Sequence, residues 1–175
     1  MLQTNHDNTP VKNEFHCPVR DLPQQAKAVI VGGGIAGASV AYHLAKLGWT
    51  DIHLLEQNRL SSGTTWHSAG QVGQLRSSQS QTRVNKASAW LYAGLQQATG
   101  HDPGWVQCGG LQLAASAERL RQLKRNAAMA GVFQVDAEII SPNECANYWP
   151  ELRINDLHGG VYLPSDGRVL PGECT

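Results

Sequence analysis

The chain has 175 residues, of which 41% are hydrophobic and 16% charged, so it is long enough for one globular domain with a packed core. Its 14 basic and 14 acidic side chains balance, which argues against a nucleic-acid partner or an anionic membrane surface. The four cysteines are scattered without a CxxC pair, which argues against a zinc site and a dense disulfide framework.

Residues 1–25 are expected to form a flexible polar lead-in, because Pro10, Pro18 and Pro23 discourage regular structure. The segment has neither the apolar core of a secretory signal nor the composition of a transit peptide. No stretch approaches the length of a membrane span. We therefore expect a cytoplasmic protein, or a protein of the mitochondrial matrix if the chain is eukaryotic.

A βαβ unit is predicted after the lead-in. Lys27–Val31 is a short run with β-branched residues that predicts a fully buried parallel strand. Apolar residues then recur at helical spacing from Ile35 to Leu47, and Gly48 closes this helix. Asp51–Glu56 predicts the second strand.

The remaining chain predicts a mixture of strands and helices. Residues 59–76 are rich in serine and glycine without either period and are interpreted as a long ordered loop, a feature that is usually functional. Cap residues and apolar runs predict the further elements, which are helices at Val84–Thr99, Ser116–Ala130 and Ser141 to about Pro150, and strands at Trp105–Ala115 and Gly160–Leu163.

This order predicts an α/β fold, in which a Rossmann-like nucleotide-binding domain is interrupted by the start of a mixed α+β domain. The predicted first part of the nucleotide domain covers residues 26–104, and the second domain begins over residues 105–164. Residues 165–175 are expected to return towards the nucleotide domain, which would then be truncated.

Three glycines, Gly32, Gly34 and Gly37, form a GxGxxG fingerprint between the first strand and its helix. The first permits a tight turn, the second lets the backbone approach a pyrophosphate, and the third lets helix and strand pack closely. An acidic residue, Glu56, lies 19 positions beyond the last glycine, at the end of the next strand. In this setting the fingerprint predicts a bound dinucleotide.

The start of the helix and Glu56 are expected to hold opposite ends of the adenosine diphosphate. The N–H groups near Ile35 and Ala36 would face the phosphates, where the helix dipole favours negative charge. Glu56 would accept hydrogen bonds from the ribose and repel a 2′-phosphate, which favours FAD or NAD over NADP.

The segment from Ser61 to Gly70 follows directly, and its small residues can bring the backbone close to a ligand. His67 lies 11 residues beyond Glu56, and an extended chain of that length reaches at most about 36 Å, enough to run from the ribose of FAD to its ring. The further cofactor contacts expected in this region are Gln57, Gly63, Thr64, Thr65, Ser68, Ala69 and Gly70.

From about Ala28 to its last residue the chain resembles the sarcosine and dimethylglycine dehydrogenases, within the D-amino-acid-oxidase-like flavoproteins. The motifs that carry the resemblance are VIVGGGIAGASVAYHLAKLG, LLEQ, SSGTTWHSAG, GWVQCGGLQLA and LPSDG. The SGTTWH and GWVQ segments are closer to the sarcosine branch. The resemblance implies an FAD-dependent oxidation of an N-methyl group to an iminium, with hydride transfer to the flavin.

The resemblance also implies that His67 carries FAD covalently. A neutral imidazole is a nucleophile near neutral pH, so a histidine held beside the flavin 8α-methyl group can attach itself. The alternative is noncovalent FAD beside a packing histidine. Trp66 is interpreted as a packing aromatic.

A carboxylated amine substrate needs a cation, preferably an arginine. Arg76 and Arg83 follow the flavin loop, and basic residues of this region face the substrate in related amine oxidases. Arg76 is the stronger candidate for contacting a substrate carboxylate, with a solvated surface arginine as the alternative.

The resemblance implies a longer protein, of which this chain would be the N-terminal part and unstable alone. Family members pass a one-carbon unit to tetrahydrofolate in a C-terminal domain and give electrons to an electron-transfer flavoprotein or a quinone system. Three other functions are weighed: a dioxygen-using oxidase, a noncatalytic regulatory homologue without the linking histidine, and an NAD-dependent dehydrogenase. The last leaves the loop from Ser61 to Gly70 unexplained.

Overall fold

The computed structural model describes residues 23–175. Residues 1–22 of the predicted lead-in therefore lie outside the described residues. The chain divides into two compact units, the first ending at Gly63 and the second beginning at Thr64. Each unit is described separately. The domain limits drawn at residues 104 and 164 stay predictions.

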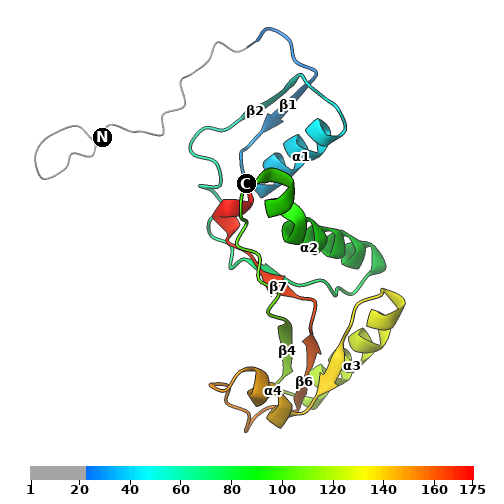
Figure 1. Cartoon of the computed structure of the whole chain (residues 1–175). Helices are drawn as coiled ribbons and strands as arrows, with labels where there is room; N and C mark the ends of the chain where they lie inside the picture. The colour runs from blue at the N-terminus through cyan, green and yellow to red at the C-terminus, as the bar shows by residue number, and fades with distance from the viewer. Residues whose placement is uncertain (1–22) are drawn as a thin grey trace, which may run out of the picture. The chain divides into compact units, whose positions relative to one another are not determined.

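The first unit contains the predicted βαβ arrangement, labelled in Figure 1. Strand β1 (Ala28–Val31) leads into helix α1 (Ile35–Lys46), which is followed by strand β2 (Ile52–Leu55). The strands pair in parallel, and Ala28 lies opposite Ile52. The sequence prediction of two parallel strands joined by a helix is therefore confirmed.

The prediction that β1 is fully buried is wrong for the described chain. Ala28 and Ile30 are half-buried, whereas Val29 and Val31 are 55% and 85% exposed. Side chains of a strand alternate between the two faces of a sheet, and in this unit α1 packs against β1 and β2. Within residues 23–63, the face that carries Val29 and Val31 has no helix of its own.

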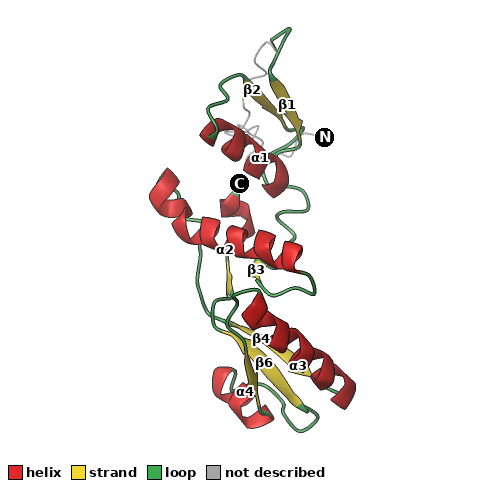
Figure 2. Ribbon diagram, turned by 90° about the vertical axis from the view of Figure 1, so that its right-hand side faces the viewer, coloured by secondary structure: helices red, strands yellow, loops and turns green. Residues whose placement is uncertain are grey.

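The second unit is built on an antiparallel sheet. Its strands are β4 (Gly110–Ala114), β5 (Glu138–Ile140) and β6 (Gly159–Leu163), in the order β4-β6-β5. Helix α3 (Ala117–Val132) packs against β4 and β6 (Figure 2), and the short helix α4 (Pro142–Tyr148) contacts β6.

The core of this unit lies between α3 and the sheet. Leu123 of α3 and Val161 and Leu163 of β6 are each at most 1% exposed, so the apolar stripe of the helix meets the inner face of the central strand. Leu75, from the predicted loop, belongs to the same cluster.

A second, two-stranded sheet joins β3 (Gln71–Val72) to β7 (Gly167–Arg168) in antiparallel pairing. The long helix α2 (Gln79–Thr99) contacts β3, and a 3₁₀ turn, η1 (Pro171–Cys174), ends the chain. None of the helices among residues 23–175 is both long and apolar enough to cross a membrane.

Three helix ends lie where the sequence predicts them. Ser116 caps α3 through its Oγ, and Ser141 forms the predicted capping box with Glu144. Gly100 ends α2 in the left-handed conformation, with φ of 78°.

Several element boundaries differ from prediction. Helix α2 begins five residues early, at Gln79, because Ser78 caps it and its first turn is polar and lacks the apolar spacing on which the prediction depended. The strand predicted from Trp105 begins at Gly110, although Val106 makes an isolated bridge to Arg168.

Three strands were not predicted. Strand β3 lies inside the segment interpreted as a loop without elements, and that interpretation is wrong at residues 71–72. Strands β3 and β7 have two residues each and β5 has three, which is too short to show a period-2 pattern.

Candidate functional site

The glycine turn at the start of α1 has the geometry that its spacing predicts. Gly32 has a φ of 106°, a conformation that L side chains rarely adopt. A Cβ atom on Gly37 would overlap the carbonyl oxygen of Gly32, so the third glycine lets helix and turn touch. These two positions therefore require glycine.

The N-terminus of α1 suits an anion. Gly34 is its N-cap and supplies no side-chain hydrogen bond, and the first turn, which includes Ile35 and Ala36, contains no acidic residue. Main-chain N–H groups at such a helix start, together with the helix dipole, favour a phosphate.

Glu56 lies at the end of β2, beside the glycine turn. Its Oε2 accepts a 2.6 Å hydrogen bond from the N–H of Gly33, and its Oε1 accepts one of 2.9 Å from the N–H of Asn58. These donors, with Gly33 contributing most, lower the pKa of Glu56. The carboxylate is therefore ionised at neutral pH and can accept hydrogen bonds from ribose hydroxyls. Gln57, the next residue, is exposed.

Ser61 belongs to this site but was not predicted as a separate contact. It is 6% exposed, its φ is 64°, and its N–H donates to the carbonyl of Gly33 over 2.9 Å. A non-glycine residue with positive φ is uncommon and has no sequence signature. The bond ties the start of the predicted flavin loop to the glycine turn.

These features fit FAD or another dinucleotide. The space beside Gly32 is open, Gly34 begins the helix without a side chain, and Glu56 offers a carboxylate to the ribose. When bound, FAD would supply the redox chemistry, while the protein supplies binding and orientation.

The predicted loop from Ser61 to Gly70 belongs in part to each unit, because Gly63 ends the first and Thr64 begins the second. In the second unit the loop is held by local bonds. The N–H of Ser68 donates to the Thr65 carbonyl over 3.1 Å, and the N–H of Gly70 donates to the Oγ of Ser68 over 3.1 Å.

Gly70 anchors the end of this loop. Its carbonyl accepts a 2.9 Å bond from the N–H of Val169, and a Cβ on Gly70 would overlap the Val169 carbonyl oxygen. His67 and Ala69 are exposed, so the imidazole is accessible at the surface of this unit. Trp66 is 67% exposed, and one side of its ring lies against Gly172 of η1.

Arg76 is held by its backbone and has a side chain directed outward. Its N–H donates to Oγ1 of the buried Thr82 over 3.0 Å, and its guanidinium donates to the carbonyl of Leu75 over 3.0 Å. Among residues 23–175 no carboxylate lies within ion-pair distance of this guanidinium, so its remaining donors can meet a ligand.

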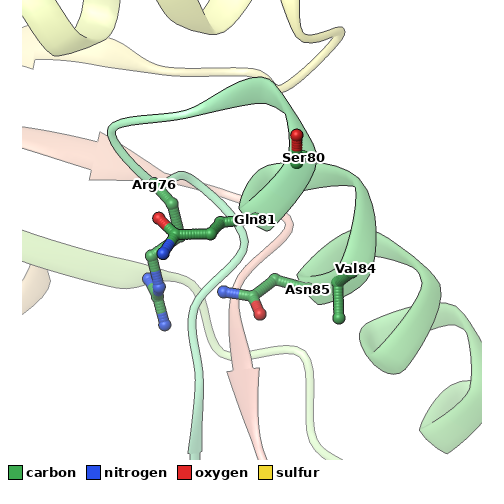
Figure 3. Close-up of a pocket in the computed structure, with 5 residues that line it drawn as sticks. All are labelled: Arg76, Ser80, Gln81, Val84 and Asn85. Carbon is green, nitrogen blue, oxygen red and sulfur yellow. The ribbon is translucent and has the colours of Figure 1, made fainter.

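Two hollows adjoin Arg76. One, of about 330 Å³, lies between Arg76 and the start of α2, and Figure 3 shows Gln81 and Asn85 reaching from that helix towards the segment of Arg76. The other, of about 550 Å³, has charged and aromatic walls that include Asp166, Arg168, Tyr162 and Trp149. Arg76 therefore borders enough open volume for a small substrate.

Asp166 is a buried carboxylate that was not predicted as a site residue, although it belongs to the LPSDG motif. It is 7% exposed, and its Oδ1 accepts a 2.8 Å bond from the N–H of Gln74. Burial raises the pKa of Asp166, against the opposing effects of the Gln74 hydrogen bond and the charge of Arg76. An aspartate in a Pro-Ser-Asp-Gly segment is typical of an ordinary turn, so no local pattern indicates that it is buried.

Comparison with known proteins identifies the family. The profile described as "FAD dependent oxidoreductase" (DAO) matches residues 27–175. Human mitochondrial sarcosine dehydrogenase is 40% identical over 160 residues, which is 90% of this chain and 17% of that protein. The mouse mitochondrial pyruvate dehydrogenase phosphatase regulatory subunit is 45% identical over 148 residues, covering 85% of this chain and 17% of that protein.

A solved structure agrees with this result. L-proline dehydrogenase from P. horikoshii superimposes with a TM-score of 0.80 at 30% identity, over 87% of this chain and 40% of that one. The chain spans less than a fifth of the sarcosine dehydrogenase and regulatory-subunit sequences that it matches. The resemblance to sarcosine and dimethylglycine dehydrogenases expected from the motifs is confirmed. The chain belongs to the FAD-dependent oxidoreductase family.

Proposed function

We propose that this chain is an FAD-binding part of an amine dehydrogenase that oxidises the N-methyl group of a small amino acid such as sarcosine or dimethylglycine. The observation that carries the proposal is the glycine turn with Glu56 beside it, in a chain matched by the FAD oxidoreductase profile over residues 27–175. The names of the sarcosine and dimethylglycine dehydrogenases among its relatives support the substrate class.

In the proposed reaction the N-methyl carbon loses a hydride to FAD and becomes an iminium carbon. This requires the amine lone pair, and an alkyl amine has a pKa of about 10 in water, so the site must favour the neutral amine. Hydrolysis of the iminium would release formaldehyde unless tetrahydrofolate captures the one-carbon unit elsewhere in the protein.

Arg76 is proposed to bind the substrate carboxylate. Its backbone is fixed by Thr82 and its guanidinium borders two hollows, while the described residues offer it no carboxylate. A guanidinium matches a carboxylate with two parallel hydrogen bonds, which fixes the orientation of a small amino acid.

We further propose that His67 carries FAD covalently. The exposed position of His67 on a turn that Ser68 and Gly70 stabilise supports this assignment. Acid precipitation tests it. Flavin fluorescence should stay with the precipitated wild-type protein and with a His158→Ala control, but leave the pellet in His67→Ala. Release from the wild type would contradict the covalent link.

A noncatalytic regulatory subunit is the second candidate, favoured by the 45% identity to the mouse phosphatase regulatory subunit. His67 argues against it, because the regulatory homologues are expected to lack the linking histidine. Bleaching of the flavin absorbance when sarcosine is added without oxygen would support the dehydrogenase. A flavin that no N-methyl amino acid bleaches would favour the regulatory role.

The proposed electron acceptor is an electron-transfer flavoprotein or a quinone system, with dioxygen as the alternative. Turnover with an artificial acceptor in the absence of peroxide would support the dehydrogenase, whereas stoichiometric peroxide would identify an oxidase.

A further inference from the structure

Two segments far apart in the sequence are joined at Asp166. Asp166 directly precedes β7 in the sequence, and its Oδ1 accepts a 2.8 Å hydrogen bond from the main-chain N–H of Gln74, 92 residues away. Gln74 also donates through its side-chain amide to the carbonyl of Ser165 over 2.7 Å. Asp166 and Gln74 are 7% and 8% exposed, so water competes little for these bonds.

Glycines on both sides make room for this carboxylate. A Cβ on Gly110 would lie 2.9 Å from the Oδ2 of Asp166, and one on Gly73 would lie 3.3 Å from it. Because these two glycines have no side chains, their backbones can lie close to the carboxylate of Asp166. The fit explains how a charged side chain can be buried among β3, β4 and β7.

The segment held in this way continues directly to Arg76. Asp166 fixes its backbone at Gln74, and two residues later Thr82 accepts the N–H of Arg76 over 3.0 Å. The hydroxyl of Thr82, which is fully buried, in turn donates to the carbonyl of Ser78 over 2.9 Å. The backbone of Arg76 is thus fixed from both sides, while its guanidinium borders the hollow that Asp166 also lines.

We propose that Asp166 is a positioning residue, which holds the Gln74–Arg76 segment so that the Arg76 guanidinium can bind the carboxylate of the substrate. This inference rests on the proposed function of Arg76. We assign Asp166 no direct substrate contact, because it is only 7% exposed and its Oδ1 is occupied by the N–H of Gln74. Its negative charge is near Arg76 without pairing with it, so the guanidinium keeps its donors for the ligand.

Two measurements on the flavin-loaded full-length protein test the proposal. The first is the dissociation constant of methoxyacetate, a carboxylate in which an ether replaces the amine of sarcosine, read from the flavin absorbance. Asp166→Ala should weaken binding by about 10- to 100-fold, as expected for a misplaced binding group. Arg76→Ala should weaken binding by a similar factor. The double variant should bind no worse than Arg76→Ala, because Asp166 acts through Arg76.

The second measurement is amide hydrogen exchange over residues 71–78. Exchange should accelerate in Asp166→Ala and return towards the wild-type rate in Asp166→Asn, whose Oδ1 can still accept the Gln74 N–H. Asp156→Ala, which removes an exposed partner of Arg153, should change neither measurement.

If Asp166→Ala accelerates exchange but leaves methoxyacetate binding unchanged, Asp166 has only a structural role and the proposal is overturned. Additive losses in the double variant would also overturn the proposal, because they would show that Asp166 acts independently of Arg76. Failure of the proposed function is distinct, since the wild-type protein itself would then bind no methoxyacetate and its flavin would not be reduced by an N-methyl amino acid.

Discussion

The N–H of Gly33 donates a 2.6 Å hydrogen bond to the Oε2 of Glu56, so the glycine turn and the end of β2 are joined by a direct contact. The carboxylate that is expected to hold the adenosine ribose is therefore oriented by the same turn that is expected to hold the pyrophosphate. Asn58 orients its other oxygen over 2.9 Å. Two parts of one dinucleotide site are preorganised by the main chain.

Glu56→Gln should weaken FAD binding by about 10- to 100-fold, because the charged acceptor for the ribose hydroxyls becomes a neutral one. The affinity is best measured in a His67→Ala background, where a covalent bond cannot trap the flavin. Quenching of flavin fluorescence on titration of the apoprotein gives the dissociation constant. Glu151→Gln, an exposed change in the second unit, is the control and should bind FAD as the background does.

Gly37→Ala should destabilise the protein by about 1–3 kcal/mol, because its Cβ would overlap the Gly32 carbonyl and force the backbone apart. The variant should also retain less FAD after purification. Thermal unfolding and the ratio of flavin to protein absorbance measure the two effects.

Gly131→Ala is the matched control, since nothing lies within 4 Å of a Cβ built on this exposed glycine of α3. It should leave flavin content unchanged and stabilise the protein by about 0.5–1 kcal/mol, the helix preference for alanine over glycine. Equal flavin retention in Gly37→Ala and Gly131→Ala would contradict the close contact inferred at the glycine turn.

Local sequence patterns were enough to predict the βαβ unit, because each of its parts has a recognisable pattern of its own. The glycine spacing, the β-branched run before it and the position of Glu56 need no knowledge of distant residues. Helix caps at Ser116 and Ser141 could be predicted for the same reason, since a cap bonds within one turn.

The contacts around Asp166 could not be predicted, because they depend on tertiary structure. The bond from Gln74 joins residues 92 positions apart, and nothing in either local segment specifies its partner. Strands β3 and β7 are defined by pairing with each other and have two residues each, so no periodicity could indicate them. The burial of β1 depends on which elements cover its two faces. The residues of the strand do not specify this.

Arg76→Ala should raise the KM for sarcosine by about 10- to 100-fold, while Arg83→Ala should have little effect. The reason is that a charge-assisted bond to the substrate carboxylate would be lost only in the first variant. Steady-state kinetics with an artificial electron acceptor separates KM from kcat. Equal effects of the two substitutions would show that neither arginine recognises the substrate specifically.

The contributions of Glu56 and Asp166 to stability should depend on pH in opposite directions. Main-chain donors lower the folded-state pKa of Glu56 below 4.5, so its stabilising contribution is present above pH 4.5 and is lost as the pH falls through the lowered pKa. Burial raises the folded-state pKa of Asp166 above 3.8, so its contribution is present below pH 3.8 and is lost as the pH rises through the raised pKa. From pH 4 to pH 7, Glu56→Gln should therefore lose thermal stability relative to wild type, whereas Asp166→Asn should gain. The melting temperatures of both variants and wild type across this range measure the two slopes, and slopes of the same sign would contradict one of the two assignments.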